Sequence, residues 1–207
     1  MKPNYDLEML NILEENKGKK VLLHSCCGPC SSYCIKELAK YLKVTVLYYN
    51  PNIEPKEEYN KRKEVQIKLI NDYKKEEIDV SYIDSDYDND IYRDYVTGYE
   101  KELEGGKRCT KCFELRLSKT ATLAKKLNYD FFATTLTVSP HKNSTLINQI
   151  GFEIEKNENI KFLPSDFKKR EGYKKSIEYS KKYDLYRQDY CGCLFSKQTR
   201  KEDKIWN

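Results

Sequence analysis

Short apolar runs and longer periodic segments alternate through the first two thirds of the chain. Four short runs are rich in apolar and β-branched residues and are flanked by polar or turn-forming positions, as strands are. We expect strands at Val21–His24, Val44–Tyr49, Ile78–Ile83 and Phe131–Ala133. Between these runs, apolar residues return every three or four positions, which is the period of one helix face.

These periodic segments predict the helices. We expect them after Gly28-Pro29, from Pro55 to about Tyr73, from about Ile91 to near Gly105, and along the stripe from Phe113 to Leu127. Strands that alternate with helices predict βαβ units and a mostly parallel sheet, which makes the fold class α/β. In such sheets, ligands bind beyond the carboxyl ends of the strands.

No linker composition, repeat or low-complexity tract divides the chain, so we expect a single domain over residues 1–207. Within it we expect an N-terminal helical addition (1–19), an α/β core (20–165) and a helical, basic C-terminal part (166–207). No apolar run has the length of a signal peptide or a membrane span. The expected location is therefore cytoplasmic, with no membrane partner.

The net charge of +5 is a mild excess, with 38 basic against 33 acidic side chains. Basic residues gather toward the C-terminus, at Lys168, Lys169, Arg170, Lys174, Lys175, Lys181, Lys182, Lys197, Arg200 and Lys201. Tyrosines are interleaved with them, at Tyr173, Tyr179, Tyr183, Tyr186 and Tyr190. Cations and aromatic faces together suit an RNA surface. A solvated helix with tyrosines packed underneath is the other interpretation.

Eight cysteines fall into three tight clusters. The first holds Cys26, Cys27 and Cys30, with Cys34 one turn later; the second holds Cys109 and Cys112; the third holds Cys191 and Cys193. In a reducing compartment, such clusters indicate soft-metal ligands or redox thiols rather than structural disulfides. We interpret Cys34 as a small buried apolar residue, and His24 as a hydrogen-bonded core histidine.

The spacing within the first two clusters favours a polynuclear metal centre. Cys109 and Cys112 place two sulfurs on nearly one face of a helical turn. The adjacent pair Cys26-Cys27 is awkward for a single tetrahedral ion, whereas an iron–sulfur cube offers several irons. We therefore expect these four cysteines to hold a [4Fe–4S] cluster, with zinc as the alternative.

The third cluster, Cys191-Gly192-Cys193, has one intervening residue. A disulfide across so small a ring is strained and easily reduced, which suits a pair that donates two electrons and is reduced again. Alternatively, one or both thiols complete the metal site. Cys30 lies close enough to the first pair to act as a spare thiol beside the cluster, and it is a further candidate catalytic residue.

Four segments together resemble the epoxyqueuosine reductase family of the QueH type. They are Leu22–Ser31, Arg108–Leu117 with the following Thr120-Ala121, Thr134–Lys142, and Tyr186–Cys193, and they occur in the family's order. The resemblance spans Leu22 to Ser196. The residues before Lys20 lie outside it.

This resemblance implies the last step of queuosine biosynthesis, in which epoxyqueuosine at the tRNA wobble position is reduced to queuosine. It implies a Rossmann-like sheet related to the PP-loop and HUP folds, a tRNA substrate and an external electron donor. It places a [4Fe–4S] cluster on Cys26, Cys27, Cys109 and Cys112, and a redox-active catalytic pair on Cys191 and Cys193. Family members vary at the position of Cys30, and an additional iron ion has been associated with that corner.

Two other functions are compatible with parts of the sequence. An adenylating PP-loop-like tRNA-modification enzyme needs a Ser-Gly-Gly-x-Asp-Ser loop to bind pyrophosphate after the first strand. The chain has Ser25-Cys26-Cys27-Gly28-Pro29 there, and the proline removes an N–H. A zinc-stabilised RNA-binding module without catalysis would use the basic, tyrosine-rich C-terminal part. Zinc without iron or sulfide would favour that module.

Overall fold

A computed structural model describes residues 3–198 of the protein. The helices are α1 (Tyr5–Glu15), α2 (Gly28–Leu38), α3 (Lys56–Lys75), α4 (Asn89–Tyr95), α5 (Lys107–Lys126), η1 (Thr135–Val138, a 3₁₀ turn), α6 (Ser144–Glu158) and α7 (Gly172–Lys182). The strands are β1 (Lys20–His24), β2 (Lys43–Leu47), β3 (Val80–Ile83), β4 (Phe131–Thr134) and β5 (Lys161–Phe162).

The five strands form one sheet in the order β3-β2-β1-β4-β5, and every pair is parallel. This confirms the predicted α/β, Rossmann-like fold. The strand order reverses beside β1, so the chain leaves β1 and β4 toward opposite faces of the sheet. A crevice forms at such a switch point, at the carboxyl ends of the strands. Cys26 follows β1 there, and Thr135 follows β4.

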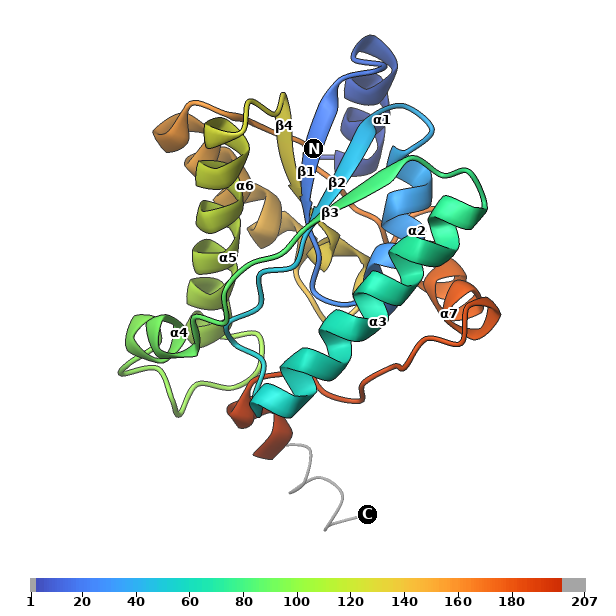
Figure 1. The fold of residues 1–207 in the computed structure, drawn as a ribbon. Helices are drawn as coiled ribbons and strands as arrows, with labels where there is room; N and C mark the ends of the chain where they lie inside the picture. The colour runs from blue at the N-terminus through green and yellow to red at the C-terminus, as the bar shows by residue number, and fades with distance from the viewer. Residues whose placement is uncertain (1–2, 199–207) are drawn as a thin grey trace.

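Helices cover both faces of the sheet (Figure 1). Val21 and Leu23 of β1 pack in a core shared with α1, α2 and α3, and this core also contains Leu185 beyond α7. Leu22, which points the other way, packs with residues of α5 and α6. Alternating strand side chains therefore enter two separate cores, so β1 is buried on both sides and its carboxyl end is rigidly held.

The expected helix from Ile91 to Gly105 is wrong in its length, because α4 ends at Tyr95. Gly98 follows with a φ of +86°, a left-handed conformation that stops a helix. The Arg108 guanidinium then donates to the carbonyl oxygens of Tyr99 (3.3 Å) and Glu100 (2.8 Å), which satisfies loop groups that a helix would have paired internally. The strand β5 and the helix α6 were not among the expected elements.

The C-terminal extension is helical in α7, and residues 183–193 then run without helix or strand. The five interleaved tyrosines are buried or half-buried, which favours packing over an exposed aromatic surface. Arg200 and Lys201 lie outside the described residues. Within residues 3–198, no helix combines the length and apolar character needed to cross a membrane.

Candidate metal and redox site

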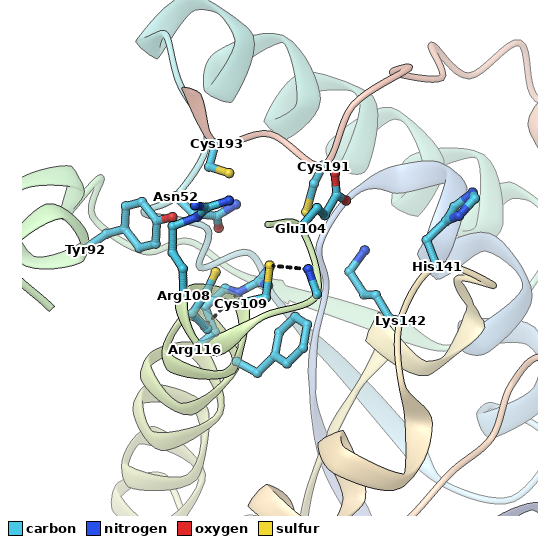
Figure 2. A pocket seen from close by; sticks show the side chains of 13 residues that line it. Asn52, Tyr92, Glu104, Arg108, Cys109, Arg116, His141, Lys142, Cys191 and Cys193 are labelled. Carbon is cyan, nitrogen blue, oxygen red and sulfur yellow. Dashed lines mark hydrogen bonds between the residues drawn. The ribbon is translucent and has the colours of Figure 1, made fainter. Parts of the chain in front are cut away.

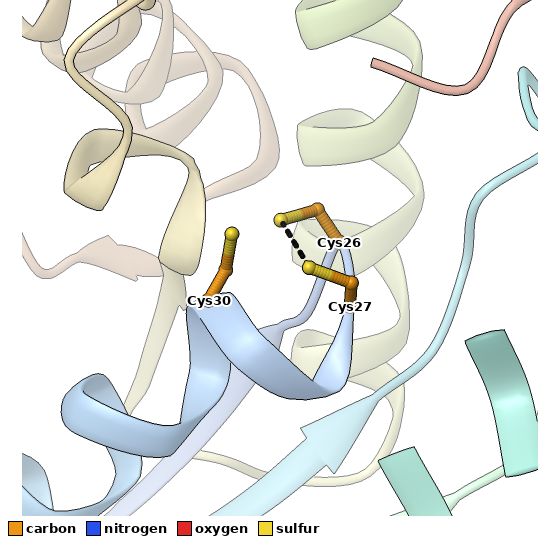
Figure 3. A group of neighbouring side chains, drawn as sticks. All are labelled: Cys26, Cys27 and Cys30. Carbon is orange, nitrogen blue, oxygen red and sulfur yellow. Dashed lines mark hydrogen bonds between the residues drawn. The ribbon is translucent and has the colours of Figure 1, made fainter. Parts of the chain in front are cut away.

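Three cysteines meet where β1 passes into α2. Cys27 caps the helix with extended backbone, and Pro29 occupies its first turn, as the sequence predicted. The Sγ atoms of Cys26, Cys27 and Cys30 all lie within 4.8 Å of one another, and those of Cys26 and Cys27 are 3.9 Å apart (Figure 3). The structure thus places the Sγ of Cys30 beside those of the adjacent pair.

The pKa values of these three thiols shift in different directions. Hydrogen bonds from Cys27 and Cys30 hold the pKa of Cys26 well below its usual value. Donation to Cys26 raises the pKa of Cys27 to about 11 and that of Cys30 well above the usual range. The Thr135 hydroxyl lies 3.5 Å from Cys26 Sγ as a further donor. Cys26 is therefore the thiol of the three that most readily becomes a thiolate, which is the form that binds metals.

Cys109 and Cys112 lie one turn apart at the start of α5, as expected. The backbone N–H of Gly105 donates to Cys109 Sγ at 3.2 Å (Figure 2). Cys112 is buried, and burial raises its pKa to about 12. Both side chains line a pocket, here called the Cys109 pocket, together with Cys191 and Cys193.

Cys191 and Cys193 are free thiols in the structure. Ser196 connects them: its Oγ accepts from the Cys191 N–H at 3.2 Å, and its own N–H donates to Cys193 Sγ at 3.5 Å. The Ser196 hydroxyl also donates to Glu104 at 2.9 Å. Cys193 is buried, and this burial raises its pKa to about 11. Ser196 thus holds the reduced pair and links it to Glu104, in the loop before α5.

A second pocket, here called the Cys26 pocket, is lined by Cys26 and Cys30 and adjoins the first. Residues that line both pockets are Glu104, Arg116, His141, Lys142 and Cys191. Six cysteines from three distant parts of the sequence therefore converge on one region. Among residues 3–198, however, Cys109 and Cys112 do not join the group whose sulfurs lie within 4.8 Å.

This separation bears on the kind of metal centre. Zinc binds four sulfurs at about 2.3 Å from one point, so all four would have to lie close together. The cubane cluster spreads its irons, and each takes a different thiolate. Cys26 lines one of two adjoining pockets, and Cys109 and Cys112 line the other, so these thiols fit a polynuclear centre better than one small ion. The trio of Cys26, Cys27 and Cys30 is the arrangement that a single ion would use.

Unpartnered polar atoms mark the same region. Among the described residues, six buried side-chain atoms have no hydrogen-bond partner. Four of these belong to residues that line the two pockets: Asn52 Oδ1, Arg108 Nε, Arg116 Nη2 and Gln188 Oε1. Buried polar groups are normally paired in native proteins. This concentration is what a site built around a bound polar or charged group shows.

Two cations face the cysteines. Arg116 is buried; its Nε donates to the Cys112 carbonyl at 3.2 Å and its Nη1 to Asn50 Oδ1 at 3.3 Å. Burial opposes the charge of Lys142, but electrostatic interaction with the side chains of Cys191, Cys26 and Cys30 raises its pKa above the usual value. A buried cation is costly unless an anion accompanies it. The donor set and its charges therefore fit an anionic thiolate cluster.

His24 and Cys34 have the structural roles expected from the sequence. His24 Nε2 lies 3.1 Å from the Tyr49 carbonyl and must donate to it, so Nδ1 accepts from the Thr134 hydroxyl at 3.0 Å. Burial lowers the pKa of His24 to about 3, and the ring is neutral. Cys34 is fully buried, with its Sγ 3.3 Å from the Cys30 carbonyl.

Several site residues were not identified from the sequence. Thr135 and Gln188 contact Cys26 and Cys27, and Arg116 lies between the two pockets. All three fall inside or beside the segments that carry the family resemblance, which was the available signal. Their residue types are common, and nothing local distinguishes them from surface residues.

Comparisons with known proteins show the family of this chain. The family model described as epoxyqueuosine reductase QueH matches residues 21–199. An epoxyqueuosine reductase QueH from Streptococcus pyogenes serotype M1 is 41% identical over 209 aligned residues, covering 99% of this chain and 82% of the relative. The Staphylococcus epidermidis protein of that name is 43% identical, and the alignment covers 94% of this chain and 85% of the relative. The Thermotoga maritima protein of that name is 37% identical, and the alignment covers 88% of this chain and 92% of the relative. This chain therefore belongs to the epoxyqueuosine reductase QueH family.

Proposed function

We propose that this protein reduces the epoxide of epoxyqueuosine in tRNA, giving the alkene of queuosine and water. One observation carries the proposal: six cysteines converge on two adjoining pockets at the carboxyl end of β1. Removing an epoxide oxygen requires two electrons and two protons. A site rich in thiols supplies electrons, and the family membership names the substrate.

We assign Cys26, Cys27, Cys109 and Cys112 as ligands of a [4Fe–4S] cluster. Arg116 supports this assignment, since a buried guanidinium with an unpartnered Nη2 suits an anionic neighbour. The cluster, when bound, would supply one-electron transfer at low potential. Cys30 is then a thiol beside the cluster, where an additional iron would also find a ligand.

We assign Cys191 and Cys193 as the redox-active pair. The step balances: two thiols become one disulfide and release two electrons and two protons, while the epoxide takes up both and releases water. An external reductant then restores the two thiols. Free thiols in both residues support this role, as does the position of Cys191 between the two pockets.

The Cys26 pocket is the proposed place for the wobble nucleotide. Its cavity volume is about 310 Å³, and its lining is mixed, with Tyr173, Arg187 and Lys142 among the residues. An aromatic ring and cations suit an unstacked base with its phosphates. A tRNA substrate and a set of free thiols also agree with a cytoplasmic location, which we propose.

The test begins with anaerobic purification and quantitation of iron, sulfide and zinc. The protein is then incubated with tRNA that contains epoxyqueuosine and with a chemical reductant, and nucleosides are analysed by mass spectrometry. Queuosine formation is the expected result. An iron-replete protein that forms none would refute the assignment, and zinc without iron or sulfide would favour the RNA-binding module.

A further inference from the structure

The segment that carries the proposed redox pair has no helix or strand to hold it. Residues 183–193 are irregular, yet Gly192 and Cys193 are buried. Two of its anchors lie in the loop before α3: the Glu54 N–H donates to the Gly192 carbonyl at 2.9 Å, and the Tyr190 hydroxyl donates to the Glu54 carbonyl at 2.9 Å. The third anchor is Arg62 of α3.

Arg62 is 1% exposed, and every edge of its guanidinium is used. Nε donates to Glu58 Oε1, one turn earlier on α3, at 2.7 Å. Nη1 donates to the Cys191 carbonyl at 3.1 Å, and Nη2 lies 3.5 Å from the Tyr190 carbonyl. The guanidinium also lies over the Tyr190 ring, 4.9 Å from its centroid. One side chain thus binds two successive peptide groups just before Gly192.

Gly192 shows how closely this contact is fitted. Its φ is +130°, and a Cβ there would lie 2.9 Å from Ile53 Cγ1 and 3.0 Å from Arg62 Nη1. The guanidinium therefore packs directly against the backbone between the two cysteines. A lysine cannot reproduce this, since its single ammonium lacks the planar fork that reaches Glu58 and two carbonyls together.

We propose that Arg62 is the positioning residue that holds the Cys191 and Cys193 thiols at the Cys109 pocket. It does not touch the pocket itself; it acts through the backbone of the pair. The proposal rests on the proposed function for the role of the thiols, but the position of the thiols can be measured without it.

The first measurement is the rate at which iodoacetamide alkylates the native, anaerobic protein. Trypsin cleavage after Arg187 and Lys197 gives a peptide of residues 188–197 that contains both thiols. We expect Arg62→Gln and Arg62→Lys each to increase alkylation of this peptide about tenfold, because the segment is released from α3. Lys68→Met is the matched control: Lys68 also lies on α3 and binds a carbonyl of the same segment, that of Tyr183. Its rate should equal that of the wild type.

The second measurement is turnover with epoxyqueuosine-containing tRNA. We expect kcat to fall about 100-fold in Arg62→Lys, with KM for tRNA and iron content unchanged, because misplaced reacting groups lower the rate rather than binding. Glu58→Leu, which removes the acceptor of Arg62 Nε and of the Tyr186 hydroxyl in the same segment, should show the same pattern more weakly and covers the case in which Arg62 variants fail to fold. Unchanged alkylation in Glu58→Leu, or equal increases in Lys68→Met, would overturn the proposal. A wild type without turnover would refute the proposed function and leave the alkylation test decisive for Arg62.

Discussion

The side-chain amide of Gln188 donates to the Sγ of Cys27 at 3.2 Å, across a separation of 161 residues. This contact joins the C-terminal segment to the turn after β1. It places a donor on a proposed cluster ligand from a residue that also lines the Cys26 pocket. The amide oxygen of Gln188 is buried without a hydrogen-bond partner, so the hydrogen bond from Nε2 to Cys27 is what orients this side chain.

Replacing Gln188 with leucine removes that donor. Hydrogen bonds to cluster sulfurs stabilise the reduced form, so we expect the midpoint potential of Gln188→Leu to be more negative than that of the wild type. A redox titration followed by electron paramagnetic resonance measures this potential. Gln198→Leu, at an exposed position, is the control and should titrate like the wild type. A more positive potential in Gln188→Leu would contradict the assignment.

The assignment of ligands makes a graded prediction for single cysteine variants. Cys109→Ala should lose the iron–sulfur absorbance, because a ligand is gone. Cys34→Ala, at a buried position outside both pockets, should keep it. We expect Cys30→Ala to keep four irons and four sulfides as well. If Cys30→Ala loses the cluster while Cys109→Ala retains it, the trio around Cys26 is the ligand set instead.

Cys191→Ser separates the redox pair from the metal centre. We expect this variant to keep the brown chromophore and its iron content while losing turnover, since a serine cannot form the disulfide. Optical spectra and nucleoside analysis on one preparation measure both. Loss of the absorbance in this variant would make Cys191 a cluster ligand.

Gly192→Ala tests the tight backbone around the pair. Gly192 has a φ of +130°, which strains an alanine backbone, and the added Cβ would lie 2.9 Å from Ile53 Cγ1 and 3.0 Å from Arg62 Nη1. We expect the free energy of unfolding to fall by about 3 kcal/mol. Gly18→Ala has a φ of +81° and open space around its Cβ, so strain alone should cost it about 1 kcal/mol. Urea denaturation compares the two, and equal losses would show that the contacts at Gly192 contribute nothing.

Glu76 ties α7 to the other helices and should make stability depend on acid. Its carboxylate accepts from Lys182 (2.6 Å), the Tyr183 hydroxyl (2.8 Å) and Lys36 (3.0 Å). Hydrogen bonds from Lys182 and Tyr183 lower the pKa of Glu76 from 4.5 to about 2.

The unfolded chain therefore takes up a proton at Glu76 first as the pH falls. The contribution of the ionised Glu76 side chain to the free energy of unfolding is complete above pH 4.5 and is lost as the pH approaches 2. Because Glu76 is partly exposed, we expect this contribution to be about 1 kcal/mol. Unfolding curves of wild type and Glu76→Gln between these pH values measure it. A difference between the two proteins that does not change with pH would contradict the prediction.

The centre of the sheet was predictable because β1 and β4 are buried on both faces and consist mostly of consecutive apolar residues. Phe131–Ala133 is such a run, and it became β4 with one added residue. β5 was not predictable in this way, since only Lys161 and Phe162 pair with β4. The predicted length of α4 was wrong for a different reason. Arg108, in the first turn of α5, binds carbonyl oxygens of the loop after α4, and no local sequence pattern predicts this contact.

For the site, the cysteine spacing identified every thiol that lines the pockets. Spacing could not show that Cys30 lies within 4.8 Å of Cys26 and Cys27, because that depends on where the helix starts. Nor could it find Arg62, Arg116 or Gln188. These residues work through contacts across tens to hundreds of positions, which only the folded chain defines.

The place of β4 beside β1 determines when the centre can be completed. Cys26 and Cys27 leave the ribosome early, but the neighbouring strand and Thr135 follow 109 residues later. Gln188 and the redox pair emerge last. A nascent chain folds largely in the order of synthesis, so its first three thiols must wait unprotected while most of the sequence is translated. Residues 183–193, which contact the site, are therefore synthesised late, and chains that terminate early would present Cys26, Cys27 and Cys30 without this segment.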